Sequence, residues 1–188
     1  MFKADIDNET YIAILEPRHA AELFNLIEGS RDSIGKWLSF PDSTNEMKDT
    51  ENFIEKSLKR FASNNGYWAG IWHQGKIAGS VGYLYFDWNN NKTEIGYWLG
   101  ENFEGLGLAT KSCNLLVKHA FDDLEINKVE INVASINIKS KAIPERLGFS
   151  EEGTIRDYEY LNGQYLDRTI YGLLKEEWMN KSWKVGNS

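Results

Sequence analysis

The feature that most constrains the fold is a strand, a glycine-rich turn and a helix that follow one another near the middle of the chain. Residues 92–99 form a strand-like segment, and Gly105 and Gly107 mark the turn. A further strand is predicted at 129–133, so the helix between them makes a crossover within one sheet. The helix starts near Leu108, and its apolar face recurs at helical spacing, at Ala109, Cys113, Leu116, Val117, Ala120 and Phe121.

The segments before this unit combine helices with an antiparallel meander. A strand is predicted at 11–15, followed by a helix that Pro17 opens, a short helix and loop at 30–45, and a longer helix that Ser43 or Thr44 caps. The strands at 67–72, 77–88 and 92–99 are joined by short polar turns, as in a meander. The apolar faces of the two longer helices are Ala20, Leu23, Phe24 and Ile27, and Ile54, Leu58, Phe61 and Ala62.

After the crossover, the pattern continues with alternating elements. We predict a helix at 140–147, strands near 153–158 and 167–174, and a short helix at 175–180. The whole chain, residues 1–188, is therefore expected to form a single α/β domain with one mixed, mostly antiparallel sheet flanked by helices.

Charge and composition exclude several classes of function. The 21 Lys and Arg residues against 28 Asp and Glu give a net charge of −7, whereas nucleic-acid binding calls for a basic face. The one cysteine, Cys113, allows no intrachain disulfide and no multi-cysteine zinc site, which favours an intracellular, cytoplasmic protein. No apolar run approaches the ~18–20 residues of a membrane helix.

No metal site is expected either. The segment Asp87-x-Asn89-x-Asn91 begins like a calcium loop, but Lys92 stands where glycine is needed and Trp98 where glutamate is needed.

The glycine turn suggests an anion-binding site. Glycines let the backbone approach an anion closely, and the start of a helix offers free N–H groups and the positive end of the helix dipole. A Walker loop is excluded because Thr110 precedes Lys111-Ser112 where that motif needs glycine. A Rossmann turn is disfavoured because Thr110 occupies the position of the third glycine in that motif. It is also disfavoured because the turn follows an antiparallel meander. A purely structural connection stays open as the alternative.

Two motifs in the right order resemble the GNAT N-acetyltransferases. Glu104-Gly105-Leu106-Gly107-Leu108-Ala109 is similar to their acetyl-CoA motif [QR]-x-x-G-x-[GA], and Asn137-Ile138-Lys139-Ser140 with 145–149 is similar to their N-x-x-S…LGF segment. The strings 151–156 and 159–163 resemble the ribosomal-protein N-terminal acetyltransferases of the bacterial RimJ/RimL type. The resemblance covers about residues 11–178.

This resemblance implies a fold and a cofactor. The fold would contain a central parallel strand pair that splays apart, leaving the backbone of Trp98 and Leu99 free for pantetheine and the thioester carbonyl. Position 104 is Glu where the motif prefers Gln or Arg, and we expect its side chain to point to solvent. The residues implied to bind acetyl-CoA are Trp98, Leu99, Glu104, Gly105, Leu106, Gly107, Leu108, Ala109, Thr110 and Asn137.

The resemblance also implies a reaction, in which an amine attacks acetyl-CoA directly in a ternary complex. Glu159 matches the base that deprotonates the amine, and Ser140 matches the group that protonates the departing CoA thiolate. Trp37 is a candidate for the acceptor groove. Their structural alternatives are a solvated carboxylate for Glu159, a helix N-cap for Ser140 and a turn residue for Asn137.

The preferred acceptor is the N-terminal α-amine of a protein, such as a ribosomal protein. A small amine (a polyamine, amino sugar or amino acid) and a CoA-binding module without catalysis stay open as alternatives. No nucleic-acid or membrane partner is expected, and the aromatic-rich strands make a homodimer reasonable.

Overall fold

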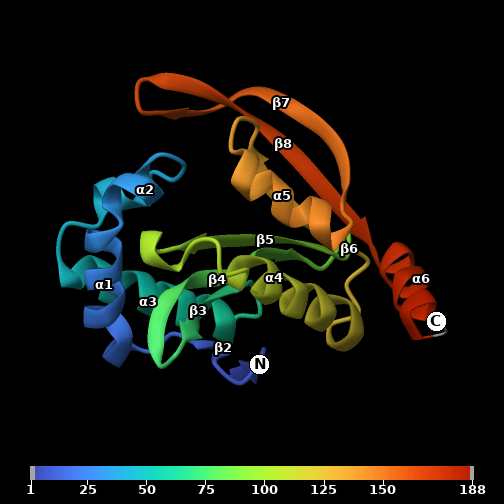
Figure 1. Cartoon of the computed structure of the whole chain (residues 1–188), viewed down its shortest axis with the longest axis horizontal. Helices are drawn as coiled ribbons and strands as arrows, with labels where there is room; N and C mark the ends of the chain where they lie inside the picture. The colour runs from blue at the N-terminus through green and yellow to red at the C-terminus, as the bar shows by residue number, and fades with distance from the viewer. Residues whose placement is uncertain (1–2, 187–188) are drawn as a thin grey trace.

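One sheet of eight strands organises the computed structural model, which describes residues 3–186, with side chains through residue 180 (Figure 1). The strand order across the sheet is β1-β2-β3-β4-β5-β6-β8-β7. The predicted mixed sheet flanked by helices is confirmed. The strands are β1 Lys3–Asp5, β2 Thr10–Ile14, β3 Tyr67–His73, β4 Lys76–Asp87, β5 Lys92–Leu99, β6 Lys128–Ala134, β7 Ser150–Leu161 and β8 Gln164–Leu174.

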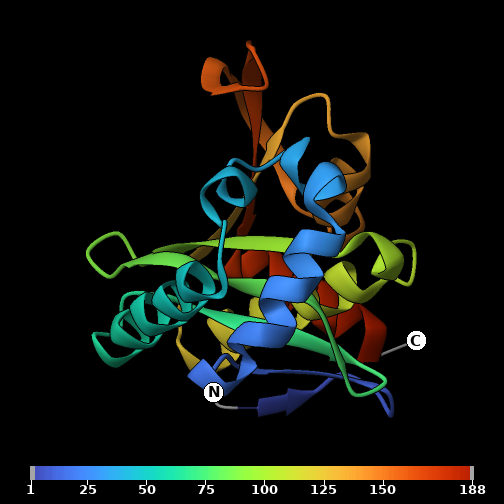
Figure 2. The ribbon, with the colours of Figure 1, turned by 90° about the vertical axis from the view of Figure 1, so that its left-hand side faces the viewer.

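Helices cover both faces of this sheet (Figures 1 and 2). Helices α1 and α3 pack on one face, where Leu23 and Ile54 join Trp98 of β5 in one apolar cluster. Helix α4 packs on the other face, against Ile95. The α-helices are α1 Ala20–Gly29, α2 Arg31–Gly35, α3 Met47–Ala62, α4 Leu108–Lys118, α5 Ile138–Leu147 and α6 Lys175–Gly186; short helical turns are Pro17–His19, Phe40–Ser43, Glu101–Phe103 and, of π type, His119–Asp123.

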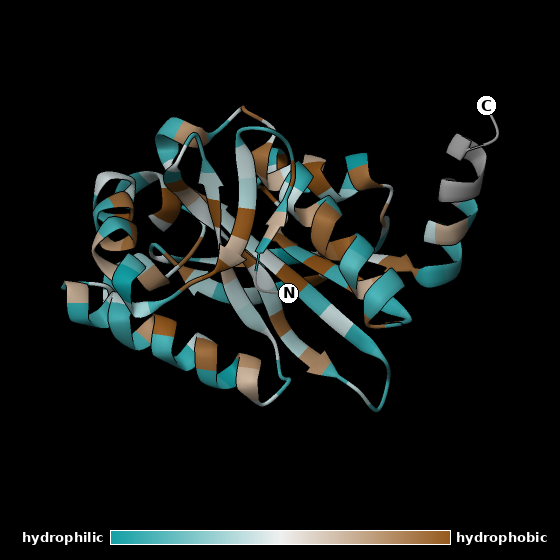
Figure 3. Cartoon of the chain, turned by 90° about the horizontal axis from the view of Figure 1, so that it is seen from below, coloured by the Kyte–Doolittle hydropathy of each residue, from teal (hydrophilic) through white to brown (hydrophobic). Residues whose placement is uncertain are grey.

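The predicted apolar face of α4 is confirmed. Cys113 and Leu116 are completely buried, and the remaining members of the predicted face are buried with them. Figure 3 shows the bands of hydrophilic and hydrophobic residues that alternate along the helices. Because this face packs on the central strands, it fixes the start of α4 beside the end of β5.

The parallel strands β5 and β6 separate after a short contact. Their pairing joins only 92–94 of β5 to 128–130 of β6. On its other side, β5 stays paired with β4 through Leu99. The edge of β5 that faces β6 therefore opens after Glu94, and the predicted splayed strand pair is confirmed.

The sequence analysis misses one strand and misplaces the cap of one helix. The strand β1 was not predicted, because its three charged and apolar residues carry no strand pattern. Helix α3 is capped by Glu46, which shares a reciprocal capping box with Asp49. The hydroxyls of Ser43 and Thr44 donate instead to the carbonyl of Phe40, so neither residue caps α3.

The last hairpin, β7 with β8, is much longer than predicted. Residues 150–158 are exposed on β7, so they lack the apolar alternation by which a strand is recognised. The hairpin arches over α5 and reaches toward α2 (Figure 1). At its tip, Nδ2 of Asn162 donates to the carbonyl of Gly35 at 2.9 Å. Among the described residues, the helices are too short or too polar to cross a membrane.

Candidate active site

A large cavity crosses the opening between β5 and β6. Its volume is about 1130 Å³, and its walls come from α2, α3, β5, the start of α4, β6, α5 and β8. It thus joins the two faces of the sheet at the point where the strands separate. One half lies against the start of α4, and the other lies against α2 and α3.

The start of α4 is arranged to receive an anion. Gly107, its N-cap, has φ of +74° and makes no side-chain capping bond, and no acidic residue lies in the first turn. A Cβ at Gly105 or Gly107 would meet no atom within 4 Å. Both glycines line the cavity with Leu108, Ala109 and Thr110. The N–H groups of this first turn therefore have no side-chain acceptor among the described residues, and they border open space.

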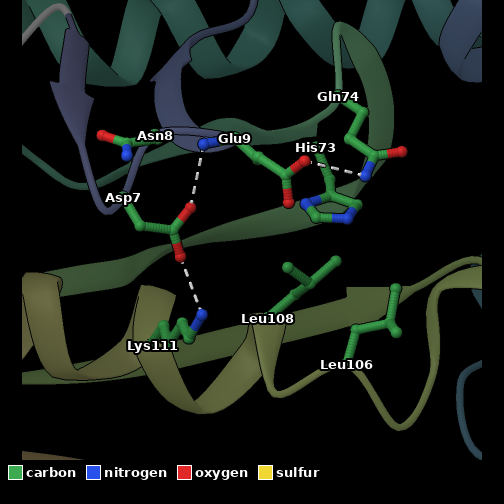
Figure 4. A pocket seen from close by; sticks show the side chains of 8 residues that line it. All are labelled: Asp7, Asn8, Glu9, His73, Gln74, Leu106, Leu108 and Lys111. Atoms are coloured by element: carbon green, nitrogen blue, oxygen red, sulfur yellow. Dashed lines mark hydrogen bonds and ion pairs between the residues drawn. The ribbon is translucent and has the colours of Figure 1, made fainter.

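Leu106 differs from its predicted neighbours. Its side chain is half-exposed and lines a second hollow of about 580 Å³ beside α4 (Figure 4). In that hollow Nζ of Lys111 contacts the Asp7 carboxylate at 2.7 Å. The Lys111 ammonium holds the pKa of Asp7 at about 2. The Lys111 ammonium therefore pairs with Asp7 and not with an anion at the glycine turn. At that turn, the main-chain N–H groups are the groups that can bind an anion.

Glu104 is exposed, as expected, and its side chain also has a partner. Its carboxylate contacts Nζ of Lys139 at 2.9 Å, and both residues line the cavity. The pair joins the glycine turn to the first turn of α5. An acidic residue beside a phosphate site is tolerated here because an ammonium neutralises it.

The predicted pantetheine residues Trp98 and Leu99 both line the cavity. Trp98 is only 8% exposed and packs against Phe40, with 5.4 Å between the ring centroids. Trp37 and Phe53 line the same half of the cavity. Trp37, the residue predicted to face the acceptor, therefore lies in the cavity wall.

The N-cap role that the sequence suggested for Ser140 belongs to Asn137, and Ser140 lies in the first turn of α5. Asn137 is the N-cap of α5, and its Oδ1 accepts from the backbone N–H of Ser140 at 3.1 Å. The alternative that Ser140 caps the helix is therefore wrong, and α5 starts earlier than predicted. Both residues line the cavity. The Ser140 Oγ lies 3.0 Å from the hydroxyl of Tyr97.

Glu159 is connected to the cavity wall through an ion pair with Arg168. Its Oε2 accepts from Arg168 at 2.8 Å, and Arg168 lines the cavity. Among the described residues, those of the cavity wall do not include Glu159. The bond engages one carboxylate oxygen, and Oε1 is left for an amine or a water.

The polar residues of the cavity that the sequence analysis did not assign to the site include Glu94, Asn132 and Arg168. Burial raises the pKa of Glu94, and the Arg168 charge and a hydrogen bond from Asn132 partly oppose this rise. Oδ1 of Asn132 and Nε of Arg168 are buried without a partner among the described residues. Strand periodicity offers one signal, because Glu94 and Trp98 lie on the same face of β5. For Asn132 and Arg168 the sequence offers none.

Comparison with known proteins agrees with this geometry. Residues 11–150 match the model of a family described as "Acetyltransferase (GNAT) domain". The chain is 40% identical to the "Putative ribosomal N-acetyltransferase YdaF" of Bacillus subtilis (strain 168), over 95% of this chain and 98% of that protein.

Two solved structures are similar over nearly their whole length. The microcin C7 self-immunity acetyltransferase MccE, solved with acetyl-CoA and AMP, is 31% identical with a TM-score of 0.85, over 90% of this chain and 94% of that chain. RimL, a ribosomal L7/L12 α-N-protein acetyltransferase solved with coenzyme A, has a TM-score of 0.89 at 23% identity, over 93% of this chain and 99% of that chain. The likeness to RimL is one of fold.

Proposed function

The chain belongs to the GNAT acetyltransferase family, and from this premise we propose that it acetylates the N-terminal α-amine of a protein such as a ribosomal protein. The transferase activity from acetyl-CoA comes with the family. The acceptor is the proposed part. One observation carries it: a single cavity joins the anion-binding start of α4 to a polar cluster on the opposite side of the splayed strands.

Binding of the cofactor follows from the glycine turn. The pyrophosphate lies against the N–H groups of the first turn of α4, and pantetheine runs beside Trp98 and Leu99 toward the gap between β5 and β6. Asn137 and the Glu104–Lys139 pair border this path.

The acceptor enters from the side of α2 and α3. Its ammonium is attracted by the carboxylates of Glu94 and Glu159, and Glu159 takes the proton, directly or through a water. The free amine attacks the thioester carbon, and the C–S bond then breaks with its electron pair on sulfur. The Ser140 hydroxyl passes a proton to this sulfur and takes one back from a water, which in turn receives the proton that the acylated nitrogen loses as the amide forms.

A protein N-terminus suits this site for two reasons. An α-amine has a pKa of ~7.7–8.0, so that a weak base suffices near neutral pH. The cavity is open and its acceptor half is lined by aromatic side chains that can hold the first residues of a chain. The ribosomal acceptor is further supported by the name of the relative at 40% identity. Such a protein would work in the cytoplasm, where acetyl-CoA and ribosomes occur together. We also propose that it forms a homodimer, which sedimentation analysis tests.

A small amine is the second candidate acceptor. It is favoured by the likeness to MccE, whose structure was solved in complex with both acetyl-CoA and AMP. In that case, the aromatic wall of Trp37, Phe40 and Phe53 would hold a ring rather than a peptide.

The experiment that separates these acceptors is mass spectrometry after incubation with acetyl-CoA. The substrates are peptides with a free N-terminus, the same peptides with a blocked N-terminus and a free lysine, and a panel of polyamines, amino sugars and amino acids. We expect acetylation of the free α-amine alone. Acetylation of the small amines alone would assign the second function, and an absence of thiol release with every amine would leave only a CoA-binding module.

Replacing Ser140 with alanine is expected to lower kcat while acetyl-CoA binding stays within a few-fold of wild type. A thiol with a pKa of ~8.5 leaves with only modest help, so the loss should be smaller than the ~10²–10⁴-fold of a removed general acid or base. Because Asn137 caps α5, the melting temperature should stay near that of wild type. A loss of stability of about 1 kcal/mol with an unchanged rate would instead assign a structural role to this hydroxyl.

Activity is expected to survive treatment with EDTA. Among the described residues, there is no cluster of three or more His, Cys, Asp or Glu able to hold a metal ion. The Asp87 carboxylate is occupied by Asn90, through both its side chain and its backbone N–H. Initial rates with and without EDTA provide the measurement. A loss of activity that calcium restores would indicate that the Asp87–Asn91 loop binds this metal.

A further inference from the structure

A proline interrupts the hydrogen bonding of α5 beside the cavity. In a regular α-helix, the N–H of residue 144 donates to the carbonyl of residue 140. Residue 144 is Pro144, which has no N–H. The carbonyl of Ser140 thus loses its regular helix donor.

Tyr97 of β5 supplies the missing donor. Its hydroxyl lies 3.1 Å from the carbonyl oxygen of Ser140. The two residues are 43 positions apart in the sequence, so the contact belongs to the fold and not to the helix. A side chain from the splayed strand therefore completes the first turns of α5.

The same hydroxyl also contacts the side chain of Ser140, at 3.0 Å from Oγ. A tyrosine hydroxyl carries one proton and accepts through its lone pairs. With that proton directed to the carbonyl, the phenol oxygen accepts from Ser140 Oγ in the resting site. Two contacts then fix the backbone and the side-chain rotamer of Ser140 at the cavity wall.

Tyr97 acts here as a neutral group. Burial raises the pKa of Tyr97 above its ordinary value, so it stays protonated over the working range of an enzyme. It is a fixed donor and not a source of the proton that leaves with sulfur.

We propose that Tyr97 is a positioning residue, which orients the Ser140 hydroxyl toward the sulfur of CoA. Tyr97 can bind the Ser140 carbonyl because Pro144 has no N–H to donate to it. This inference rests on the proposed role of Ser140 in the transfer. When the C–S bond breaks, the Ser140 hydroxyl turns its proton from the phenol oxygen to the new thiolate. Tyr97 keeps the oxygen of Ser140 in reach of the sulfur throughout.

The first test is a double-mutant cycle on kcat with an N-terminal peptide acceptor. Tyr97→Phe removes the hydroxyl and keeps the ring. It is expected to lower kcat about 2- to 12-fold, the equivalent of one neutral hydrogen bond, with KM for acetyl-CoA unchanged. In the Ser140→Ala background the same substitution should cause no further loss, because Tyr97 acts through Ser140. A wild-type kcat for Tyr97→Phe, or an equal loss in both backgrounds, would overturn the proposal.

Tyr83→Phe is the matched control. Its hydroxyl also donates to a backbone carbonyl, that of Leu116 at 2.6 Å, and it is buried away from the cavity. It should lower the melting temperature and leave kcat unchanged. An equal fall in kcat for both tyrosine variants would assign the effect of Tyr97 to general loosening of the core.

A second cycle tests the role of Pro144 without any acceptor. Pro144→Ala restores a backbone N–H, so Tyr97→Phe should lower the melting temperature less in this background than in wild type. An equal fall in both backgrounds would show that the proline does not recruit Tyr97. If the wild type acetylates no amine, the proposed function fails, whereas this second cycle still decides the contact between Tyr97 and α5.

Discussion

Gly107→Val is expected to abolish most of the affinity for CoA. The residue lies at φ +74°, and its missing Cβ faces open space at the edge of the cavity. A branched side chain there would fill the place of the pyrophosphate and pull the backbone out of the left-handed region. Charge-assisted hydrogen bonds contribute about 1.5–3 kcal/mol each, so losing one or two raises Kd on the order of 100-fold. Isothermal titration calorimetry with CoA measures this change.

Gly75→Val is the control for the backbone strain. Gly75 lies in the turn between β3 and β4 at φ +78°, and a Cβ there also meets no atom within 4 Å. Both substitutions force a β-branched residue into the left-handed region, at a cost of roughly 1–2 kcal/mol. Both should lower the melting temperature, but only Gly107→Val should lose CoA. Normal CoA affinity in Gly107→Val would mean that this turn is not the pyrophosphate site.

Local signals in the sequence account for the parts that were predicted well. The helix face from Ala109 to Phe121 repeats with a helical period, and every predicted member is buried. The glycines at 105 and 107 both adopt positive φ, as a tight turn into a helix requires. Such patterns depend on neighbours within a few residues. They were enough to predict the sheet, the crossover and the place of the glycine turn.

The wrong N-cap of α5 was predicted because two residue types compete for one local role. Both Asn137 and Ser140 are good N-caps, and sequence alone does not show which carbonyl or N–H each one meets. Asn137 takes the cap, and this leaves the Ser140 hydroxyl to Tyr97. The strand β7 was predicted too short because its exposed residues carry no alternation.

The polar half of the cavity was beyond prediction because its contacts are distant in sequence. Lys139 meets Glu104 across 35 positions, and Tyr97 meets Ser140 across 43. Glu94, Asn132 and Arg168 come together only because β5, β6 and β8 are brought to one opening. Apart from the strand period that places Glu94 on the same face of β5 as Trp98, no period or motif relates residues that meet in this way. They need the topology of the sheet first.

Glu159→Gln is expected to be the most damaging single change to the chemistry. The swap keeps the size and the hydrogen bonding of the side chain but removes its charge and basicity. Loss of a general base lowers kcat ~10²–10⁴-fold. The loss should be large near pH 7 and shrink above pH ~8, because an α-amine with a pKa of ~7.7–8.0 then deprotonates unaided. Profiles of kcat and kcat/KM from about pH 6 to 9 measure this with one good acceptor.

Glu94→Gln is the matched comparison, because it makes the same chemical change to a carboxylate that lines the cavity. Burial raises the pKa of Glu94, so Glu94 becomes charged at a higher pH than an ordinary glutamate. As an attractor of the ammonium, it should change mainly the KM of the acceptor, with kcat near wild type.

The two substitutions together assign the base. If Glu94→Gln shows the large kcat loss that shrinks at high pH, and Glu159→Gln raises only KM, then the roles are reversed. If Glu94 is the base, the acid limb of kcat/KM is expected above the ordinary glutamate value of ~4.3, because burial raises the pKa of Glu94. Unchanged profiles for Glu159→Gln would remove this carboxylate from the reaction. The only role left for Glu159 would then be its bond to Arg168. In that case Arg168→Lys, which cannot reproduce the planar guanidinium fork, should change kcat as little as Glu159→Gln does.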